Sequence, residues 1–486
     1  NASADQLLQC TKLHLLAGET NAAEARLQQL DGLTLDNPQR CRLALLTAKT
    51  LRYQGKPEQA LCFLLTQLGE LDQPLPARSE EQLNLLLQQL TSISERFSAH
   101  ALAELEYSAS TTQQYQLQLL EQIVLLARQQ STPLLAACAI GRMTELSLQT
   151  GRTPLTAFAF VSYGWVASWF CADYSLAQTF AAQGMQLAQQ QRSGNNANDT
   201  GDLAQSALFI HSAQVAHWFT PLAQVEQQLQ QTAKHTQQQG QWLLFEETSL
   251  LCAQLELLSN APLPQQQLNI QQQLAHCPNS SRAEASALAA IQWLTEEGTM
   301  PHTVSYQHGW QAITTIISAL LLDQQHLWPD LYHWEAPLEQ EMAGYFGVSE
   351  ALFCCALMRL IQGQHQQGLS RRRQREVEQL LSRFELWSKH CPHNFNAQRY
   401  LLQAELARLN TQPAGALFEQ ALQAARKARP GYLLALIHER YSEYLAANGQ
   451  TTLARFCLNE ARWFYQQWGA DAKVKQLAQP LSLLAQ

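Results

Sequence analysis

The stretch that decides the fold lies near the end of the chain, between residues 393 and 477. It contains NFNAQRYLLQAELARL (394–409) and AGALFEQALQAARKA (414–428), followed by YLLALIHERYSEYLAANG (432–449) and TTLARFCLNEARWFYQQWGADAKVKQL (451–477). Short polar breaks separate these segments, and the apolar residues within each recur at helical spacing. Each successive pair of segments therefore predicts a helical hairpin.

The second helices of the two hairpins repeat one pattern of small and large residues. In each, three residues at intervals of four and three share a helix face: Ala414, Phe418 and Ala421, then Ala454, Leu458 and Ala461. Equivalent residues are 40 positions apart, somewhat more than the roughly 34 of a tetratricopeptide unit. Neither hairpin could bury its apolar face alone. We therefore predict an all-α fold, a superhelical array of tetratricopeptide-like helical hairpins.

The same logic extends toward the N-terminus. Ala23 and Leu27 are matched by Ala60 and Leu64 after a shift of 37 residues. We expect three helical-repeat segments, at residues 3–190, 203–390 and 393–486, the last continuous with the array before it. The boundary between the first two is the loop QRSGNNANDTGD at 191–202, which is rich in glycine, asparagine and aspartate.

Composition excludes several classes of function. The net charge is −8, so no basic footprint points to direct nucleic-acid binding. Only 15% of residues are charged, against the usual ~25%, and glutamine evidently covers much of the surface. The eleven cysteines include no CxxC pair. We expect free thiols in a reducing compartment and a cytoplasmic location.

The most apolar stretch, residues 154–172, reads PLTAFAFVSYGWVASWFCA and carries no charge. Its 19 residues could nearly span a bilayer. The alternative is a helix packed on several sides, because the aromatic residues fall on two different faces. We expect the buried helix and no membrane span.

The C-terminal region also carries a family resemblance. The run His393-Asn394-Phe395, the turn AELARL at 404–409 and the motif WGADAKV at 468–474 resemble the helical region of large multidomain bacterial signalling proteins that contain a STAND-type P-loop ATPase. The match is best over residues 387–477, with weaker echoes at 174–187 and 217–228. In that family the helical array lies between the ATPase and an output such as a GAF–histidine kinase module, and no catalytic residue of the family falls within it.

The resemblance implies a non-catalytic sensor and protein-interaction segment. Its partners would be the ATPase and output domains of the same polypeptide, together with a protein or small-molecule signal. The chain begins at Asn1 and Ala2 without an initiator methionine, and we expect it to be part of a longer protein. An inducer-sensing region of an ATPase-type transcriptional activator is the close alternative.

Motifs for chemistry do not stand out. The sequence contains no GxxxxGK[ST], GxSxG, HExxH or GxGxxG. The group His390, Cys391 and His393 comes nearest to a metal cluster, but no second cluster has zinc-like spacing. We predict no catalytic residue, no cofactor and no metal, which disfavours the lesser alternative of an all-α enzyme with a site between helices.

Two sets of residues are candidates for binding. Trp165, Trp169, His217 and Trp218 lie in the aromatic-rich first-helix candidates 154–172 and 203–219, where they could line a ligand or partner groove. The alternative is that all four pack between helices. The only basic run supplies Arg371, Arg372, Arg373 and Arg375 for an anionic partner, or else it forms a solvated first helical turn.

Overall fold

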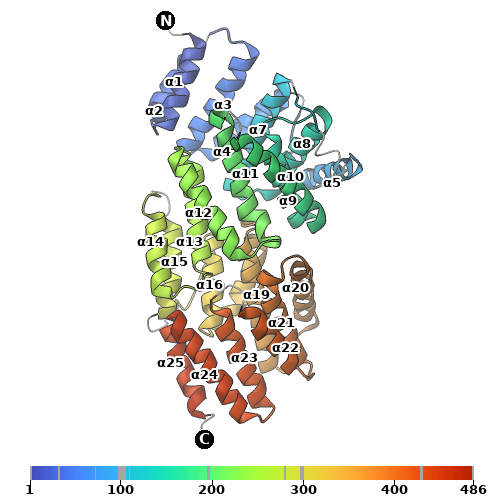
Figure 1. Ribbon diagram of the computed structural model, residues 1–486, viewed down its shortest axis with the longest axis vertical. Coiled ribbons are helices and arrows are strands. Elements are labelled where there is room, and N and C mark those ends of the chain that lie inside the picture. The colour runs from blue at the N-terminus through green and yellow to red at the C-terminus, as the bar shows by residue number, and fades with distance from the viewer. Residues whose placement is uncertain are drawn as a thin grey trace. The chain divides into compact units, whose positions relative to one another are not determined.

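The computed structural model describes residues 3–30, 33–71, 73–96, 105–108, 110–193, 197–277, 281–295, 300–426 and 431–483 (Figure 1). Within these ranges the regular structure is helical and no residue belongs to a β-strand. A single isolated bridge pairs Tyr107 with Arg152. The prediction of an all-α fold is confirmed for this part of the chain.

The chain divides into two compact units. The first comprises Asn1–His211 with His235–Gln241, and the second comprises Ser212–Lys234 with Trp242–Gln486. This division follows packing contacts, and the three repeat segments expected at 3–190, 203–390 and 393–486 stay a prediction.

In the first unit, helices that follow one another in the chain pack as neighbours, as in α1 with α2, α3 with α4, α7 with α8, and α9 with α10. Ala23, Leu27, Ala60 and Leu64 are all buried, as the 37-residue repeat predicts. The helices are α1 (Ala4–Leu16), α2 (Thr20–Gln28), α3 (Asn37–Tyr53), α4 (Pro57–Glu70), α5 (Ser79–Arg96), α7 (Thr111–Gln129), α8 (Pro133–Thr150), α9 (Thr156–Phe170), α10 (Tyr174–Ser193) and α11 (Ala197–Ile210).

The loop expected at 191–202 is largely helical. Helix α10 continues to Ser193 and α11 already begins at Ala197, while residues 194–196 lie outside the described ranges. The helix expected at 203–219 is also different. After α11 the chain forms a π-helical turn, His211–Val215, and a short 3₁₀ turn, Ala216–Trp218. The expectation of a loop was therefore wrong for most of 191–202, because glutamine- and asparagine-rich sequence can also form helix.

Helix α9 is buried over residues 156–168, as the packed-helix alternative for 154–172 predicts. Its neighbour α10 approaches it closely at Gly184. A Cβ atom at that position would lie 2.7 Å from the backbone nitrogen of Val161, so glycine permits the contact. Among the described residues one helix, α19 (Phe346–His365), is long and apolar enough to cross a membrane, and 94% of its apolar window is buried inside the protein.

The second unit is likewise built from helices. Of helix α12, residues 222–234 belong to this unit and residues 235–238 are assigned to the first. Helix α19 lies in the core and contacts α16, α20 and α21. The helices are α12 (Leu222–Gln238), α13 (Trp242–Glu256), α14 (Leu263–Leu274), α15 (Ser281–Thr295), α16 (Gly309–Leu321), α17 (Trp328–Leu331), α18 (Glu335–Glu341), α19, α20 (Arg371–His390), α21 (Pro392–Leu409), α22 (Gly415–Ala425), α23 (Leu433–Ala447), α24 (Thr451–Trp468) and α25 (Asp471–Leu483), with a 3₁₀ turn at Tyr332–Trp334.

The two C-terminal hairpins form as predicted. Helix α21 packs on α22, and α23 packs on α24 (Figure 1). Both trios of the 40-residue repeat are buried, each member being at most 4% exposed. Because Ala414, Ala421, Ala454 and Ala461 are small, the helix backbones can come close together, and Phe418 or Leu458 fills the space between them.

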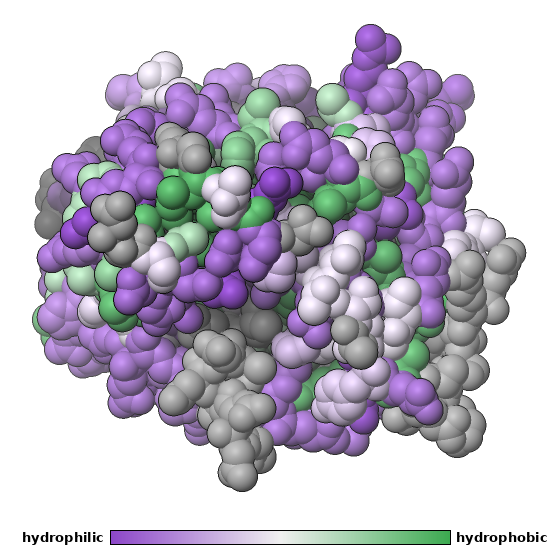
Figure 2. All heavy atoms as spheres, turned by 90° about the horizontal axis from the view of Figure 1, so that it is seen from above, coloured by the Kyte–Doolittle hydropathy of each residue, from purple (hydrophilic) through white to green (hydrophobic). Residues whose placement is uncertain are grey.

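The surface agrees with the glutamine-rich composition. On the face shown in Figure 2, hydrophilic residues predominate and apolar residues form several separate areas. A group of exposed apolar side chains lies on α24. Leu453, Phe456 and Trp463 of α24 are 54%, 61% and 52% exposed. At 100° per residue they share the face opposite the buried trio.

Candidate functional site

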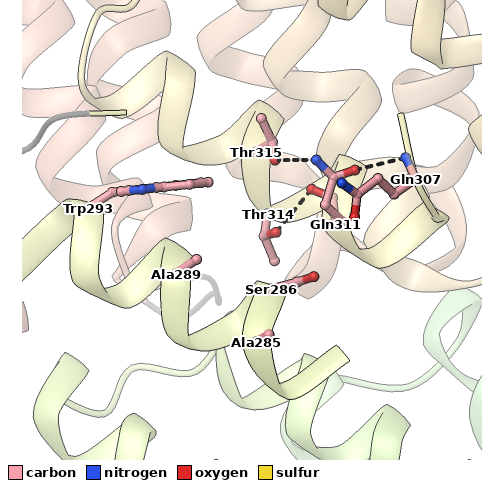
Figure 3. A pocket seen from close by; sticks show the side chains of 8 residues that line it. All are labelled: Ala285, Ser286, Ala289, Trp293, Gln307, Gln311, Thr314 and Thr315. Carbon is pink, nitrogen blue, oxygen red and sulfur yellow. Dashed lines mark hydrogen bonds between the residues drawn. The ribbon is translucent and has the colours of Figure 1, made fainter. Parts of the chain in front are cut away.

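A pocket of about 250 Å³ opens between α15 and α16 in the second unit (Figure 3). The α15 residues recur one helical turn apart and therefore share a face. Alanines at 285 and 289 leave space that larger side chains would fill, and Trp293 borders it at one end (Figure 3). The lining residues are Ala285, Ser286, Ala289 and Trp293 from α15, Gln307 from the segment before α16, and Gln311, Thr314 and Thr315 from α16.

Hydrogen bonds hold the polar end of this pocket in place. The side-chain amide of Gln311 donates from Nε2 to Thr315 Oγ1 at 3.3 Å, and its Oε1 accepts from the backbone N–H of Gln307 at 3.3 Å (Figure 3). Thr314 Oγ1 donates to the backbone carbonyl of Gln311 at 3.1 Å. The amide plane of Gln311 is thereby fixed. None of the lining residues carries a charge.

His308 bears on whether this pocket could be catalytic. As the N-cap of α16, its Nδ1 accepts the backbone N–H of Gln311 at 3.2 Å. We therefore assign the proton to Nε2, which lies 3.3 Å from Ser286 Oγ and donates to it. A nucleophilic serine needs the opposite polarity, with the imidazole accepting the hydroxyl proton. In this tautomer His308 orients the Ser286 hydroxyl rather than activating it.

A larger pocket of about 480 Å³ lies in the first unit, among α2, α3 and α4. Several of its polar groups pair with the protein itself. Gln54 Nε2 donates to Glu24 Oε2 at 2.7 Å, and the hydroxyls of Thr47 and Thr50 donate to backbone carbonyls one turn earlier. Because these three side chains and Glu24 already bond one another or the backbone, we regard the pocket between α15 and α16 as the better candidate site.

Trp165 and Trp169, two of the four predicted groove residues, belong to α9 in the first unit. Trp165 is 1% exposed and its ring lies 5.6 Å from that of Phe170 in an edge-to-face contact. Trp169 is only partly buried. Burial of Trp165 is the placement that the packing alternative predicts, and a groove role for the pair stays a prediction.

His217 and Trp218, the other two, belong to the second unit. Both are 1% exposed. The Trp218 indole donates from Nε1 to the Gln214 carbonyl at 3.1 Å and stacks on Phe395 with ring centroids 5.6 Å apart. The Trp387 ring is 5.2 Å away. These contacts are those of a core aromatic cluster, so a groove role at His217 and Trp218 also stays a prediction.

The basic run forms the first turn of α20, where the hydroxyl of Ser370 caps the helix by accepting the Arg373 N–H. Arg371, Arg372 and Arg375 are exposed, as a solvated first turn would be. Arg373 is half-buried, and its guanidinium carbon lies 5.9 Å from the Tyr332 ring centroid. Contact of these arginines with an anionic partner stays a prediction. Within the described ranges, no cluster of three His, Cys, Asp or Glu side chains is placed to hold a metal ion.

No sequence motif indicated two buried carboxyl groups, those of Glu405 and Glu350. Glu405 of α21 is fully buried and its Oε1 accepts from Arg440 Nε at 2.6 Å, while Arg408 Nη1 lies 3.6 Å from its Oε2. Burial alone would raise the pKa of Glu405, but the charges of Arg440 and Arg408 hold this pKa below its ordinary value. The two residues at 405 and 440 lie on different helices, so no local pattern relates them.

Glu350 of α19 is bonded by neutral groups instead. It is buried, and it accepts hydrogen bonds from the Tyr432 hydroxyl and, at 3.2 Å, from Gln398 Nε2. Desolvation raises the pKa of Glu350 to about 7, although both hydrogen bonds oppose the rise. A carboxyl in the apolar sequence VSEALFCCALMRLI was the available signal for this group.

We expect this carboxyl to make stability fall as pH rises. Between the ordinary pKa of 4.5 and about 7, folded Glu350 keeps a proton that the unfolded chain releases. The free energy of unfolding should therefore drop by about 3 kcal/mol across that window and level off above it. Glu350→Gln should remove this part of the pH dependence in urea unfolding. The exposed Glu378→Gln serves as control, and equal slopes for wild type and Glu350→Gln would contradict the assignment.

No protein-family model matches the sequence, and no curated protein matches it.

Proposed function

We propose that this chain is a non-catalytic sensor and protein-interaction segment of a multidomain cytoplasmic signalling protein with a STAND-type ATPase. Its hairpins would stack as a tetratricopeptide-like superhelix. The observation that carries the proposal is the equivalence of the two C-terminal hairpins, which bury the same trio of positions 40 residues apart. Stacked hairpins of this kind grow by adding units, and they typically act by presenting extended binding surfaces.

Support for a protein partner comes from the outer face of α24. Leu453, Phe456 and Trp463 expose apolar side chains there, and the exposed residues Arg455 and Arg462 border the stripe on one side. Exposed apolar residues bordered by charge are typical of interaction surfaces, and positive charge favours an acidic counterpart. The partner would therefore present an apolar patch flanked by carboxylates, as a neighbouring domain of the same polypeptide could.

The pocket between α15 and α16 favours a second candidate in the same class. A small molecule bound there would suit the inducer-sensing domain of an ATPase-type transcriptional activator. The two candidates differ in output, either a kinase-type module or a DNA-binding domain. The lesser alternative, an all-α enzyme, receives no support from the assigned polarity of the His308–Ser286 pair.

The first test is the reading frame that encodes the chain. We expect it to encode a P-loop ATPase and an output domain as well, and the chain alone should hydrolyse no ATP. In the full-length protein, the double variant Phe456→Ser/Trp463→Ser should keep its helical circular dichroism and thermal midpoint while impairing the response of the output domain.

Leu268→Ser is the matched control, since Leu268 of α14 is 51% exposed but lies outside the α24 stripe. It should leave the response unchanged. A reading frame without an ATPase or an output domain would refute the multidomain role. A double variant that signals as well as Leu268→Ser would refute the interaction surface.

A further inference from the structure

We infer that the pocket between α15 and α16 binds a small, uncharged, planar ligand whose edge carries an adjacent N–H and C=O, as in a pyrimidinedione or a pyridine carboxamide. The inference deepens the sensing role proposed above, because such a ligand would be the signal. It is tested by direct binding to the chain, so its failure would leave the interaction surface on α24 untouched.

The absence of charge among the lining residues selects a neutral ligand. The eight side chains are alanine, serine, threonine, glutamine and tryptophan. A carboxylate or ammonium group entering this space would lose hydration without gaining an ion pair from the lining, which is unfavourable. A wholly apolar ligand would fail for the converse reason, because it would cover the remaining donor and acceptor positions of the Gln311 amide without bonding them.

The two glutamines select the edge of the ligand. Gln307 and Gln311 lie next to each other at the end of the pocket away from Trp293 (Figure 3). Because Gln311 is held through Thr315 and through the Gln307 backbone, its amide presents a donor and an acceptor in one fixed plane. An amide has two N–H groups and two lone pairs on its oxygen, so one of each remains. A planar amide edge, whether within the ring or attached to it, offers the matching acceptor and donor side by side.

Trp293 selects a flat ring. Its indole extends from α15 toward α16 along the border of the cavity (Figure 3), and the methyl groups of Ala285 and Ala289 line the adjacent helix face. An aromatic ring placed there would gain offset stacking on the indole in addition to the burial of its area. The volume of about 250 Å³ suits one small ring system rather than a peptide or a nucleic acid.

The test uses uracil and nicotinamide as probes, titrated by calorimetry and by ligand-observed NMR. Nicotinate and cyclohexanecarboxamide are the matched comparisons, since the first adds a charge and the second removes the flat ring. We expect saturable binding of uracil or nicotinamide, and binding at least about tenfold weaker for both comparison compounds.

Two variants locate the binding. Ala289→Leu fills the cavity and should abolish binding without unfolding the chain, because it adds apolar volume to an empty space. Trp293→Ala should weaken binding about tenfold or more. Trp242→Ala, at a tryptophan of α13 that is 46% exposed and outside the lining, should have no effect.

Several results would overturn the inference. The first is a failure of both uracil and nicotinamide to bind saturably. The second is binding of nicotinate as tight as that of nicotinamide. The third is unchanged binding of the probes to the Ala289→Leu variant. Binding of glucose in place of both heterocycles would show that the ligand class is wrong.

Discussion

Replacing Arg440 by methionine should lower the free energy of unfolding by about 3–5 kcal/mol. Arg440 provides the closest cation to the buried Glu405 carboxylate, at 2.6 Å, and its Nη1 also reaches Glu443 at 2.8 Å. Methionine keeps much of the side-chain volume but no charge. The Glu405 carboxylate would then stay buried, and its nearby cation would be Arg408. The Arg408 guanidinium lies 3.6 Å away, which is too distant for a strong hydrogen bond.

Two further variants separate charge from packing. The double variant Glu405→Gln/Arg440→Met removes both charges and should recover most of the loss. Arg372→Met breaks the exposed pair of Arg372 with Glu376, in which the arginine side chain is 89% exposed, and should change stability by less than about 1 kcal/mol. Urea unfolding at pH 7 measures all three. If Arg440→Met is no more destabilising than Arg372→Met, the buried pair does not have the role assigned to it.

The same variant should respond to pH in a diagnostic way. In wild type the pKa of Glu405 is held low by its arginines, so its contribution to stability is present above the ordinary carboxyl pKa and is lost as pH falls. Without Arg440, the rise that burial causes in the pKa of Glu405 is less opposed. Protonation of Glu405 at lower pH then removes a poorly compensated buried charge from the variant. The difference in stability between wild type and Arg440→Met should therefore shrink as pH falls from 7 toward 4.

Replacing Trp218 by alanine should cost about 3–5 kcal/mol of stability. The indole is 1% exposed and packs against Trp387 and Phe395, with its N–H bonded to the Gln214 carbonyl. Alanine would leave a cavity among these rings and remove the hydrogen bond to the Gln214 carbonyl. Trp165→Ala in α9 should have a cost of similar size, because Trp165 is equally buried.

Trp463→Ala is the matched control, since Trp463 is 52% exposed and its loss should change stability by less than about 1 kcal/mol. Chemical unfolding followed by circular dichroism compares the variants. A stable, folded Trp218→Ala protein that has lost ligand or partner binding would favour the predicted groove over the packed cluster. Trp169→Ala, at the partly buried position, tests the groove with less risk of unfolding.

The sequence alone determined the helices and the repeated buried faces. Periodicity at 3.6 residues reports which side of a helix avoids water, and it correctly placed the Ala414 and Ala454 trios in the core. It also identified 154–172 as a packed helix. These features are local, because each depends only on residues within a few turns of one another. The loop expected at 191–202 was wrong for most of its length, because polar composition is compatible with helix as well as with loop.

The tertiary structure alone decided which faces meet. The pocket exists because small residues of α15 happen to oppose threonines of α16, and nothing in either helix reveals the other. The pairing of Glu405 with Arg440 and the hydrogen bonds of Glu350 to Tyr432 and Gln398 likewise depend on side chains brought together from distant helices. Burial and pKa respond to every neighbour in space, whereas a sequence pattern reports only neighbours along the chain. For that reason the candidate site came from packing, while the fold class came from periodicity.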